Sequence, residues 1–427
     1  MPSLYRYSRS LLLSAVVLFE LTLIAPLPAS GQTLQVLHYF TAGSDGSAPY
    51  AGLVRDRGGN LYGTTELGGR ITSNCPGGCG TVFRLKPQGS GWIYSVLYRF
   101  QGGADGSGPG TLVIGPDGSL YGTTGAGGGG GCIDSEGCGT VFKLRPPGTF
   151  CAAVSCPWEE TILYVFPNQD QRNGQSPASQ QLIFDRSGNI YGTTASGGSN
   201  DFGVVFELSP STGGWTEQVL HNFAGPPDDG ISPWSGVIFD SSGNLYGTAQ
   251  VLPSGGMLYE LTPTQSGWTE TILHNFSGND GSMLWGGLIF DSAGNLYGAT
   301  ASGGVNGGGT VFELSPSGSN WNLSVLYSLS GEPQQRPAGP VSGLTMDAAG
   351  NLYGGTTKDG LDDEGAVFKL TPNGGSWVYT SLHDFDNNGQ QGQSAWGSVL
   401  RDTAGNVYGT TVVGGQNGNG VVFEITP

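Results

Sequence analysis

The sequence predicts an all-β protein, a seven-bladed β-propeller of four-stranded blades. Three observations support this prediction. One short motif recurs seven times, and each repeat contains four runs rich in β-branched and aromatic residues. After the first 31 residues, the first and last such runs of the chain complement each other as parts of one repeat.

The repeated motif is Asn-Leu-Tyr-Gly-Thr-Thr or a close variant of it. Its tyrosine recurs at steps of 51 to 70 residues, at Tyr62, Tyr121, Tyr191, Tyr246, Tyr297, Tyr353 and Tyr408. Self-similarity at such a period indicates an array of one supersecondary unit, because a single unit cannot bury its apolar face alone. The 427 residues therefore divide into repeated modules rather than into unrelated domains.

Four short strands are expected in each repeat, and the third copy illustrates them. The first strand contains Leu182 and Ile183, and a turn of the type Asp-x-x-Gly-Asn leads to the motif itself, the second strand. A Gly-rich loop precedes a third strand at 204–208, and 215–223 forms the fourth. A proline follows two residues after the third run, where a ladder N–H is no longer needed. After residue 31, no stretch shows the sustained 3.6-residue period of apolar residues that is typical of an amphipathic helix.

The two ends of the chain predict how the ring closes. Residues 34–40 read as a fourth strand with no repeat before it, whereas 421–425 read as a third strand with no fourth strand after it. We therefore expect the N-terminal strand to pair into the last blade, which then consists of about 394–427 plus 33–40. Such closure removes two free sheet edges.

The first 31 residues have the pattern of a secretory signal. Basic residues precede the apolar run 11–19, and small residues end the segment. We expect cleavage near residue 31, a single propeller domain over 32–427, and a secreted bacterial protein, extracellular or periplasmic. An uncleaved membrane anchor over 11–29 is the alternative, and Glu20 in its middle weighs against it. Nothing later in the chain is apolar enough to span a membrane.

Composition narrows the class of partner. The formal net charge is −17, so phosphate backbones are repelled and nucleic acid is excluded as a partner. A neutral polymer such as a glycan, or a cell-surface protein, fits better. Glycine and proline are abundant, but the glycines recur at fixed offsets and aromatic residues reach 10%, which argues against disorder.

Six cysteines predict disulfides in an exported chain; they lie close in sequence as Cys75/Cys79, Cys132/Cys138 and Cys151/Cys156. A zinc site is the weaker alternative, because these spacings differ from C-x2-C and no histidine is near. In the propeller the last two cysteines lie on the face opposite the other four, so they should pair with each other. Three connectivities then remain, and local pairing of the first two and of the middle two is the simplest.

The repeat also resembles a known family. The motif Gly-Asn-Leu-Tyr-Gly-Thr-Thr, followed by Gly-Gly and then Gly-Thr-Val-Phe-Glu-Leu-x-Pro, is similar to the tandem GloVer repeat of exported bacterial proteins over about 33–427. Members are described as choice-of-anchor proteins, often with a C-terminal anchoring segment. This chain departs from that pattern by stopping at Pro427, so we do not expect the anchor. The resemblance implies no established activity and no catalytic residue.

Aromatic residues at the start of the first strand supply the predicted binding site. Alternating strand directions place the long, variable fourth-to-first and second-to-third loops on one face of the disc, and such a face is the usual binding face of a repeat protein. Twelve residues before the repeated tyrosine, four blades carry rings that should surround the mouth of the central funnel there: Tyr50, Trp234, Trp285 and Trp396. Planar rings at that mouth can stack on sugars. The alternative is that they only fill the funnel as core.

Two groups of residues suggest metal ligands, and neither makes a defined site in the sequence. The histidines occupy one equivalent position on the outermost strand of four blades, where copies cannot converge on one ion: His38, His221, His274 and His383. An acidic loop on the variable face offers only weak Ca²⁺ candidates, because its spacing matches no calcium loop: Asp359, Asp362, Asp363 and Glu364. No metal and no cofactor is predicted, and no catalytic motif is present.

The sequence therefore predicts a secreted, monomeric, non-catalytic propeller that binds a glycan or a protein through its variable face. The alternative is a polysaccharide-active lyase or hydrolase with paired carboxylates on the same face, about 5–10 Å apart. A third possibility is a cell-surface spacer without a concave site.

Overall fold

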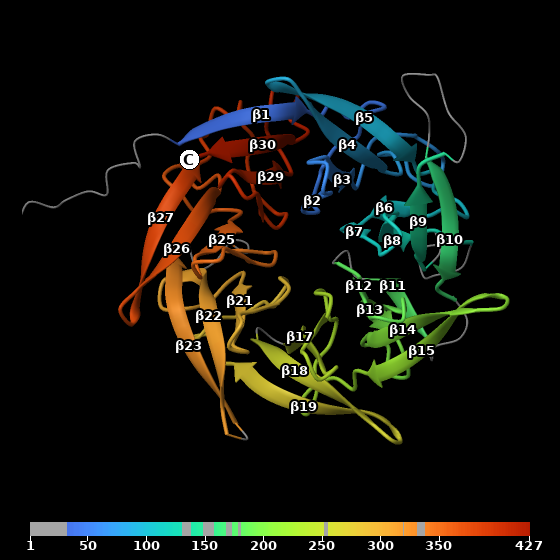
Figure 1. The fold of residues 1–427 in the computed structure, drawn as a ribbon, viewed down its shortest axis with the longest axis vertical. Coiled ribbons are helices and arrows are strands. Elements are labelled where there is room, and N and C mark those ends of the chain that lie inside the picture. The colour runs from blue at the N-terminus through green and yellow to red at the C-terminus, as the bar shows by residue number, and fades with distance from the viewer. Residues whose placement is uncertain are drawn as a thin grey trace, which may run out of the picture. The chain divides into compact units, whose positions relative to one another are not determined.

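Seven antiparallel sheets surround one axis in the computed structural model of the chain (Figure 1). The structure describes residues 32–129, 138–147, 158–167, 173–177, 181–251, 255–318, 320–330 and 338–427. Residues 31–427 form one compact unit. The predicted fold class, a seven-bladed β-propeller, is confirmed.

The blades are numbered here in chain order, and the strands of each run from the axis outward. Blade 1 consists of β2 (Val54–Arg55), β3 (Leu61–Thr65), β4 (Thr81–Gln88) and β5 (Gly91–Arg99). Blade 2 consists of β6 (Ser107–Pro109), β7 (Val113–Ile114), β8 (Leu120–Ala126), β9 (Thr140–Arg145) and β10 (Glu159–Val165). Blade 3 consists of β11 (Gly174–Pro177), β12 (Ile183–Phe184), β13 (Ile190–Gly197), β14 (Val204–Ser211) and β15 (Gly214–Asn222). Blade 4 consists of β16 (Ile238–Phe239), β17 (Leu245–Val251), β18 (Gly255–Thr264) and β19 (Gly267–Phe276). Blade 5 consists of β20 (Ile289–Phe290), β21 (Leu296–Thr300), β22 (Gly307–Ser317) and β23 (Asn320–Ser330). Blade 6 consists of β24 (Thr345–Met346), β25 (Leu352–Gly355), β26 (Ala366–Asn373) and β27 (Ser376–Asp384).

Blade 7 closes the ring with both ends of the chain. It contains β28 (Leu400–Arg401), β29 (Val407–Thr411), β30 (Val421–Thr426) and, as its outermost strand, β1 (Thr33–Tyr39). Strand β1 pairs antiparallel with β30, from Thr33 opposite Thr426 to Tyr39 opposite Val421. Figure 1 shows the two strands side by side at the seam with blade 1. The predicted closure is confirmed.

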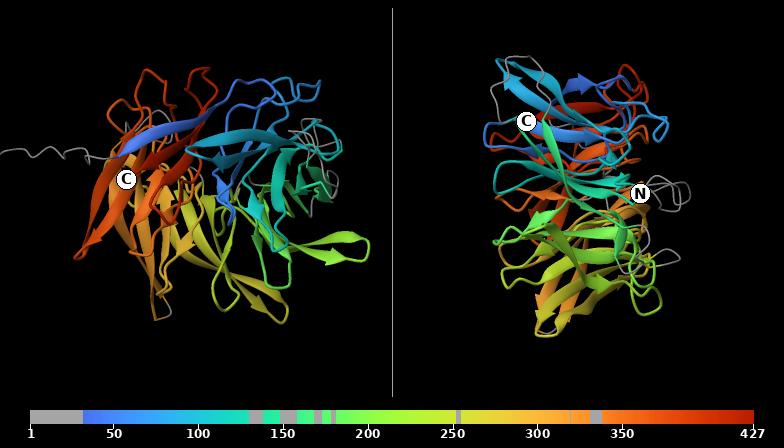
Figure 2. Two further views of the ribbon diagram at one scale, coloured as in Figure 1. Left: turned by 45° about the horizontal axis from the view of Figure 1, so that its top comes forward. Right: turned by 90° about the vertical axis from the view of Figure 1, so that its right-hand side faces the viewer.

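The third and fourth strands form longer hairpins than the sequence indicates. Strand β4 continues through Pro87, which lies opposite Trp92 of β5, before a two-residue turn. The closing pair of such a hairpin is hydrogen-bonded, so the next pair is not, and the proline needs no N–H there. The β18–β19 and β22–β23 hairpins therefore project outward from the ring (Figures 1 and 2).

The Asp-x-x-Gly-Asn turn is held together by its aspartate. In blade 5, Asp291 accepts hydrogen bonds from the backbone N–H groups of Ala293 and Asn295, from the Asn295 side-chain amide and from the Tyr297 hydroxyl. Gly294 has φ +88°, a conformation that favours glycine. The repeated tyrosine thus has a structural role, because it ties the second strand to the turn before it.

The glycine of the repeated motif makes room for the third strand. Gly63 lies directly opposite Phe83, and a Cβ there would meet the phenylalanine ring at 2.6 Å. Phe83 is fully buried. The first threonine of the motif instead joins neighbouring blades: the Thr410 hydroxyl of blade 7 donates to the Ala51 carbonyl oxygen of blade 1 at 3.0 Å. The motif therefore builds the ring.

The hydrophobic core lies between blades rather than inside one of them. Each of the seven clusters of buried side chains joins two adjacent blades. At the closing seam, Phe40 and Tyr408 of blade 7 pack with Leu53, Leu61 and Phe83 of blade 1. This arrangement explains why one repeat is not expected to be stable alone.

Cysteine pairing agrees with the sequence where it can be followed. Cys75 and Cys79 form a disulfide with their Cα atoms 5.3 Å apart, as predicted. Cys138 is also disulfide-bonded. The predicted pairs that involve Cys132, Cys151 and Cys156 depend on residues outside the described ranges. In the part of the chain that the structure describes, no helix could cross a lipid bilayer.

Candidate functional site

One cavity of about 560 Å³ opens at the axis on the face that carries the variable loops. The structure places all four predicted aromatic residues in its lining: Tyr50, Trp234, Trp285 and Trp396. Glu66, which directly follows β3, and Gly125, near the end of β8, line it as well. The volume is in the range of small-molecule sites, about 300–1,000 Å³.

Three of the rings form a continuous aromatic wall. Tyr50 meets Trp396 edge to face, with ring centroids 5.2 Å apart, and Trp396 stacks against Trp285 at 6.2 Å. Trp285 and Trp396 belong to blades 5 and 7, and blade 6 between them carries the shorter Val341 at the equivalent position. The small side chain leaves room for the two indoles to meet.

Trp234 lies apart from this wall and is the most exposed of the four aromatic residues. Its side chain is 44% exposed, whereas Trp285 and Trp396 are half-buried. The lining is completed on blades 2 and 3 by Pro109 and Pro177. The cavity therefore has both packed rings and a ring free to contact a ligand.

Small residues after each ring bring the inner strands close to one another. A Cβ on Gly286 would collide with the backbone of Ser342, and one on Gly397 with the backbone of Ala51. Backbone therefore packs on backbone around the axis, and the preceding aromatic side chains are directed toward the mouth. This packing explains why Trp-Gly recurs at these positions.

Polar groups in the wall lack partners inside the protein. Trp285 Nε1 and Ser342 Oγ are buried and make no hydrogen bond. Such groups cost free energy unless something pairs with them. Both residues line the cavity, so these two groups are available to a ligand.

Glu66 is the one carboxylate among the described residues that line the cavity. Its side chain reaches solvent, but partial burial in the cavity wall removes water from the carboxyl and raises its pKa above the ordinary value. Burial and the nearby Glu66 charge both raise the pKa of the Tyr50 hydroxyl. The carboxyl can accept hydrogen bonds from a ligand, but it has no second carboxyl in the described lining to work with.

The acidic loop does not converge on one point. Asp359 is buried and accepts hydrogen bonds from Ser330 and Tyr379, at 3.0 and 3.2 Å. Glu364 pairs with Lys358 at 3.2 Å, and Asp362 faces the Asn387 backbone N–H at 3.4 Å. Asp363 has φ +57° in the turn. Asp359, Asp362 and Glu364 each have their own protein partner, so the structure gives these weak calcium candidates no common centre.

The histidines lie on four outer strands, as expected, and each has its own surroundings. His38, His221 and His274 each contact the aspartate of the following loop, at 3.2, 3.3 and 2.8 Å. Burial lowers the pKa of His383, although nearby acidic groups act in the opposite direction.

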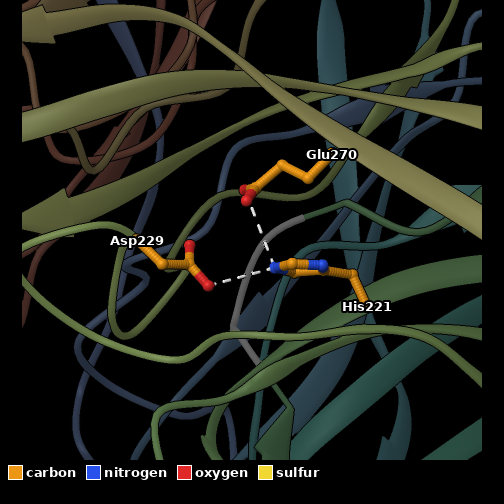
Figure 3. Close-up of side chains that lie close together, drawn as sticks. All are labelled: His221, Asp229 and Glu270. Carbon is orange, nitrogen blue, oxygen red and sulfur yellow. Dashed lines mark hydrogen bonds and ion pairs between the residues drawn. The ribbon is translucent and has the colours of Figure 1, made fainter.

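Sequence reasoning missed one constellation. His221 of β15, Asp229 of the following loop and Glu270 of β19 come together across the seam between blades 3 and 4, as Figure 3 shows. Comparison of histidine positions alone could not find it, because the third residue belongs to a different position of the repeat. Aligning each outer strand with its neighbour across the seam would have revealed it.

The fold and this cavity define a seven-bladed β-propeller with an aromatic axial site. The family model of the Gloeobacter/Verrucomicrobia repeat matches residues 15–251 and 250–427, so the chain belongs to this family. No curated protein matches it.

Solved structures resemble the chain at the level of the fold. The extracellular domain of a putative hybrid two-component system from B. thetaiotaomicron matches with a TM-score of 0.54 and 14% identity, covering 92% of this chain. This chain spans only 42% of that structure's length. A putative 6-phosphogluconolactonase from Bacteroides uniformis matches at a TM-score of 0.46 and 13% identity, covering 78% and 84% of the two chains.

Proposed function

We propose that this protein is an exported, non-catalytic propeller that binds a surface glycan in its aromatic cavity. The observation that carries the proposal is that Tyr50, Trp234, Trp285 and Trp396 line one cavity of about 560 Å³. Aromatic faces stack on the apolar faces of sugar rings. The half-exposed Trp234 indole is the ring best placed for such contact.

The polar lining also supports a hydroxyl-bearing ligand. Trp285 Nε1 can donate a hydrogen bond and Ser342 Oγ can donate or accept one, and both lack a partner in the protein. Glu66 adds an acceptor. The net charge of −17 favours a neutral glycan over an anionic one.

Export is supported by the leader pattern of residues 1–31 and by the Cys75–Cys79 disulfide, since disulfides persist in oxidising compartments. One structural neighbour is an extracellular domain.

The binding proposal is favoured over polysaccharide cleavage. Glycoside hydrolysis commonly uses two carboxyl groups about 5–10 Å apart. The described part of the cavity lining contributes Glu66 alone.

A protein partner is the second candidate, and exposed apolar residues on the variable loops favour it. Ile71, Val305 and Leu361 lie on the second-to-third loops of blades 1, 5 and 6 and are 69%, 84% and 89% exposed. These residues are scattered over three loops, whereas the cavity gathers its rings in one place, so the glycan is preferred.

A glycan-array screen of the purified protein, followed by calorimetric titration of the best ligand, tests the proposal. Trp234→Ala should weaken binding about tenfold, which corresponds to about 1.4 kcal/mol. Trp285→Ala should also weaken it, and Leu361→Ala is the matched control because it removes an exposed apolar side chain outside the cavity.

Each outcome separates the candidates. Unchanged affinity in both tryptophan variants would overturn the aromatic site. Loss of binding only in Leu361→Ala would assign recognition to the loops and favour a protein partner. Release of new reducing or unsaturated sugar ends from the ligand would favour the enzyme.

A further inference from the structure

The outer strands of neighbouring blades meet at one repeated pair of positions. Six blades carry a tryptophan at one shared position at the start of the outer strand: Trp92, Trp158, Trp215, Trp268, Trp321 and Trp377. A His or Tyr six residues after this position faces the residue that stands two after it in the next blade. Four of these contacts are direct hydrogen bonds or ring stacks: Tyr98 with Glu160, Tyr164 with Glu217, Tyr327 with Tyr379, and His38 with Tyr94. The type of contact at this shared position therefore differs from one seam to the next.

The seam between blades 3 and 4 brings an imidazole and two carboxylates together. His221 Nε2 lies 3.3 Å from Asp229 Oδ2 and 3.6 Å from Glu270 Oε1 (Figure 3). One ligand atom from each residue lies within 4.8 Å of the others. No other such cluster of three histidine, cysteine or acidic side chains occurs among the described residues.

The surrounding contacts fix two of the three side chains. Asp229 is 7% exposed, and it accepts hydrogen bonds from the backbone N–H groups of Ala224 and Gly230 at 2.6 and 2.5 Å. The His221 ring packs edge to face on Phe223, with centroids 4.8 Å apart. Outer contacts of this kind orient metal ligands in proteins.

Glu270 provides the observation that points to an additional ligand. Its Oε1 atom is buried and makes no hydrogen bond; it lies within ion-pair distance of His221 Nε2, at 3.6 Å, and within 4.8 Å of an Asp229 carboxylate oxygen. A buried carboxylate oxygen without a hydrogen bond, close to a second carboxylate, is costly. A cation between the three side chains would satisfy it.

The spacing also suits a metal ion. Zn²⁺ binds nitrogen and oxygen ligands at about 2.0–2.2 Å, and tetrahedral geometry then places ligand atoms about 3.3–3.6 Å apart. The two distances at His221 Nε2, 3.3 and 3.6 Å, lie in that range. One imidazole with two carboxylates is a donor set for Zn²⁺ and similar transition metals, whereas Ca²⁺ prefers oxygen ligands alone.

We propose that His221, Asp229 and Glu270 bind one transition-metal ion of the Zn²⁺ type, which joins blades 3 and 4 at their outer edge. The site lies on the outer strands, away from the aromatic cavity at the axis, and does not depend on glycan binding. Its role is structural: the ion adds a bond across one seam of the ring.

The next seam provides a natural control. His274 and Asp280 repeat the first two ligands, 2.8 Å apart, but blade 5 has Leu323 where blade 4 has Glu270. The histidine–aspartate pair is therefore present there without the third ligand. Glu270→Leu copies a residue that the repeat already accepts at this position, so the variant should fold.

Zinc titration of the full chain tests the proposal, with bound metal counted after dialysis and Co²⁺ absorption used to report ligand geometry. We expect one ion per chain and a rise in Tm with Zn²⁺ but not with Ca²⁺. Glu270→Leu and His221→Ala should weaken Zn²⁺ binding at least tenfold and abolish the Tm rise. His274→Ala should leave both unchanged.

A gain-of-site variant keeps the test decisive if a loss variant is unstable. Leu323→Glu completes the His274–Asp280 pair and should raise the stoichiometry from one ion to two. Absence of stoichiometric Zn²⁺ binding would overturn the proposal and leave the cluster as a metal-free contact of His221 with the two carboxylates. Equal Zn²⁺ affinity in Glu270→Leu and the unaltered chain would overturn it as well.

Discussion

The imidazole of His38 stacks on the ring of Tyr94, with centroids 3.7 Å apart and planes within 4° of each other. His38 belongs to β1, the N-terminal strand of blade 7, and Tyr94 belongs to β5 of blade 1. This contact therefore lies at the seam where the two ends of the chain close the ring. The Tyr94 hydroxyl also donates to the Asp45 carbonyl oxygen at 2.6 Å.

Replacing Tyr94 should weaken the closing seam. Tyr94→Leu removes the stack and the hydrogen bond, and we expect it to lower the free energy of unfolding by about 2 kcal/mol. Leucine already occupies the equivalent position in blades 5 and 7, as Leu323 and Leu34, so the backbone should accept it. Denaturant unfolding measures the loss, and hydrogen exchange should show faster opening of β1.

Tyr94→Phe is the matched variant for this prediction. It keeps the ring but removes the bond to Asp45, so it should cost only about 1 kcal/mol. Protection of β1 that stays unchanged in Tyr94→Leu would show that the stack does not secure the closure.

The turn aspartates should make the ring sensitive to acid. Burial alone would raise the pKa of Asp291, but hydrogen bonds from Asn295, Ala293 and Tyr297 outweigh it and hold the pKa below its ordinary value. A carboxyl with a lowered folded-state pKa stabilises the protein above its unfolded pKa, and this contribution disappears as pH falls through the folded value. Asp291→Ala should therefore cost about 2 kcal/mol at pH 7, and this cost should decrease as the pH falls below the ordinary pKa of 3.8.

The comparison is made by denaturant unfolding at several pH values. Asp291→Asn should recover part of the loss, because its amide keeps one acceptor oxygen. A cost for Asp291→Ala that is the same at pH 3 and pH 7 would contradict the role of the ionised carboxylate.

The fold was predictable because every structural element appears seven times in the sequence. An irregular copy such as blade 4, where Tyr259 replaces phenylalanine, does not hide the pattern that six others repeat. Closure followed from the same periodicity, since β1 and β30 are the two parts of one incomplete unit.

The candidate site was only partly predictable, because the repeat sets backbone positions but not what meets between blades. The twelve-residue offset placed Trp285 and Trp396 at the mouth of the funnel. That they touch depends on Val341 being small in the blade between them. Likewise, His221 meets Glu270 only because β15 and β19 are neighbours at the seam, although 49 positions separate them in sequence.

Tyr259 provides a prediction of increased stability. Its side chain is fully buried, and its hydroxyl has no hydrogen-bond partner. The other six blades have phenylalanine at this position, also fully buried. Tyr259→Phe removes an unpaired buried hydroxyl, so it should raise the free energy of unfolding by about 1 kcal/mol. Thermal and denaturant unfolding measure the change, and an equal or lower stability would indicate that the hydroxyl is paired in solution.

Glu160 should make the ring less stable as pH rises toward neutrality. Burial and the charge of Asp105 raise the pKa of Glu160 to about 7, although a hydrogen bond from Tyr98 acts in the opposite direction. The Tyr98 hydroxyl contacts both carboxylates, at 3.0 Å from Asp105 and 3.3 Å from Glu160, while Glu160 Oε1 is buried without a partner. Two acidic groups thus share one donor.

The sign of the effect follows from the raised pKa of Glu160. Because the folded-state value, about 7, exceeds the ordinary value of 4.5, the folded protein holds an extra proton between these limits. Its stabilising contribution is complete below about pH 4.5 and is lost as pH rises through 7. Glu160→Gln stays neutral throughout, so relative to the unaltered chain it should gain about 1 kcal/mol at pH 8, after allowance for solvent screening, and nothing at pH 4.5. Unfolding titrations at these two pH values measure the difference, and a gain independent of pH would show that the Glu160 carboxyl does not titrate near neutrality.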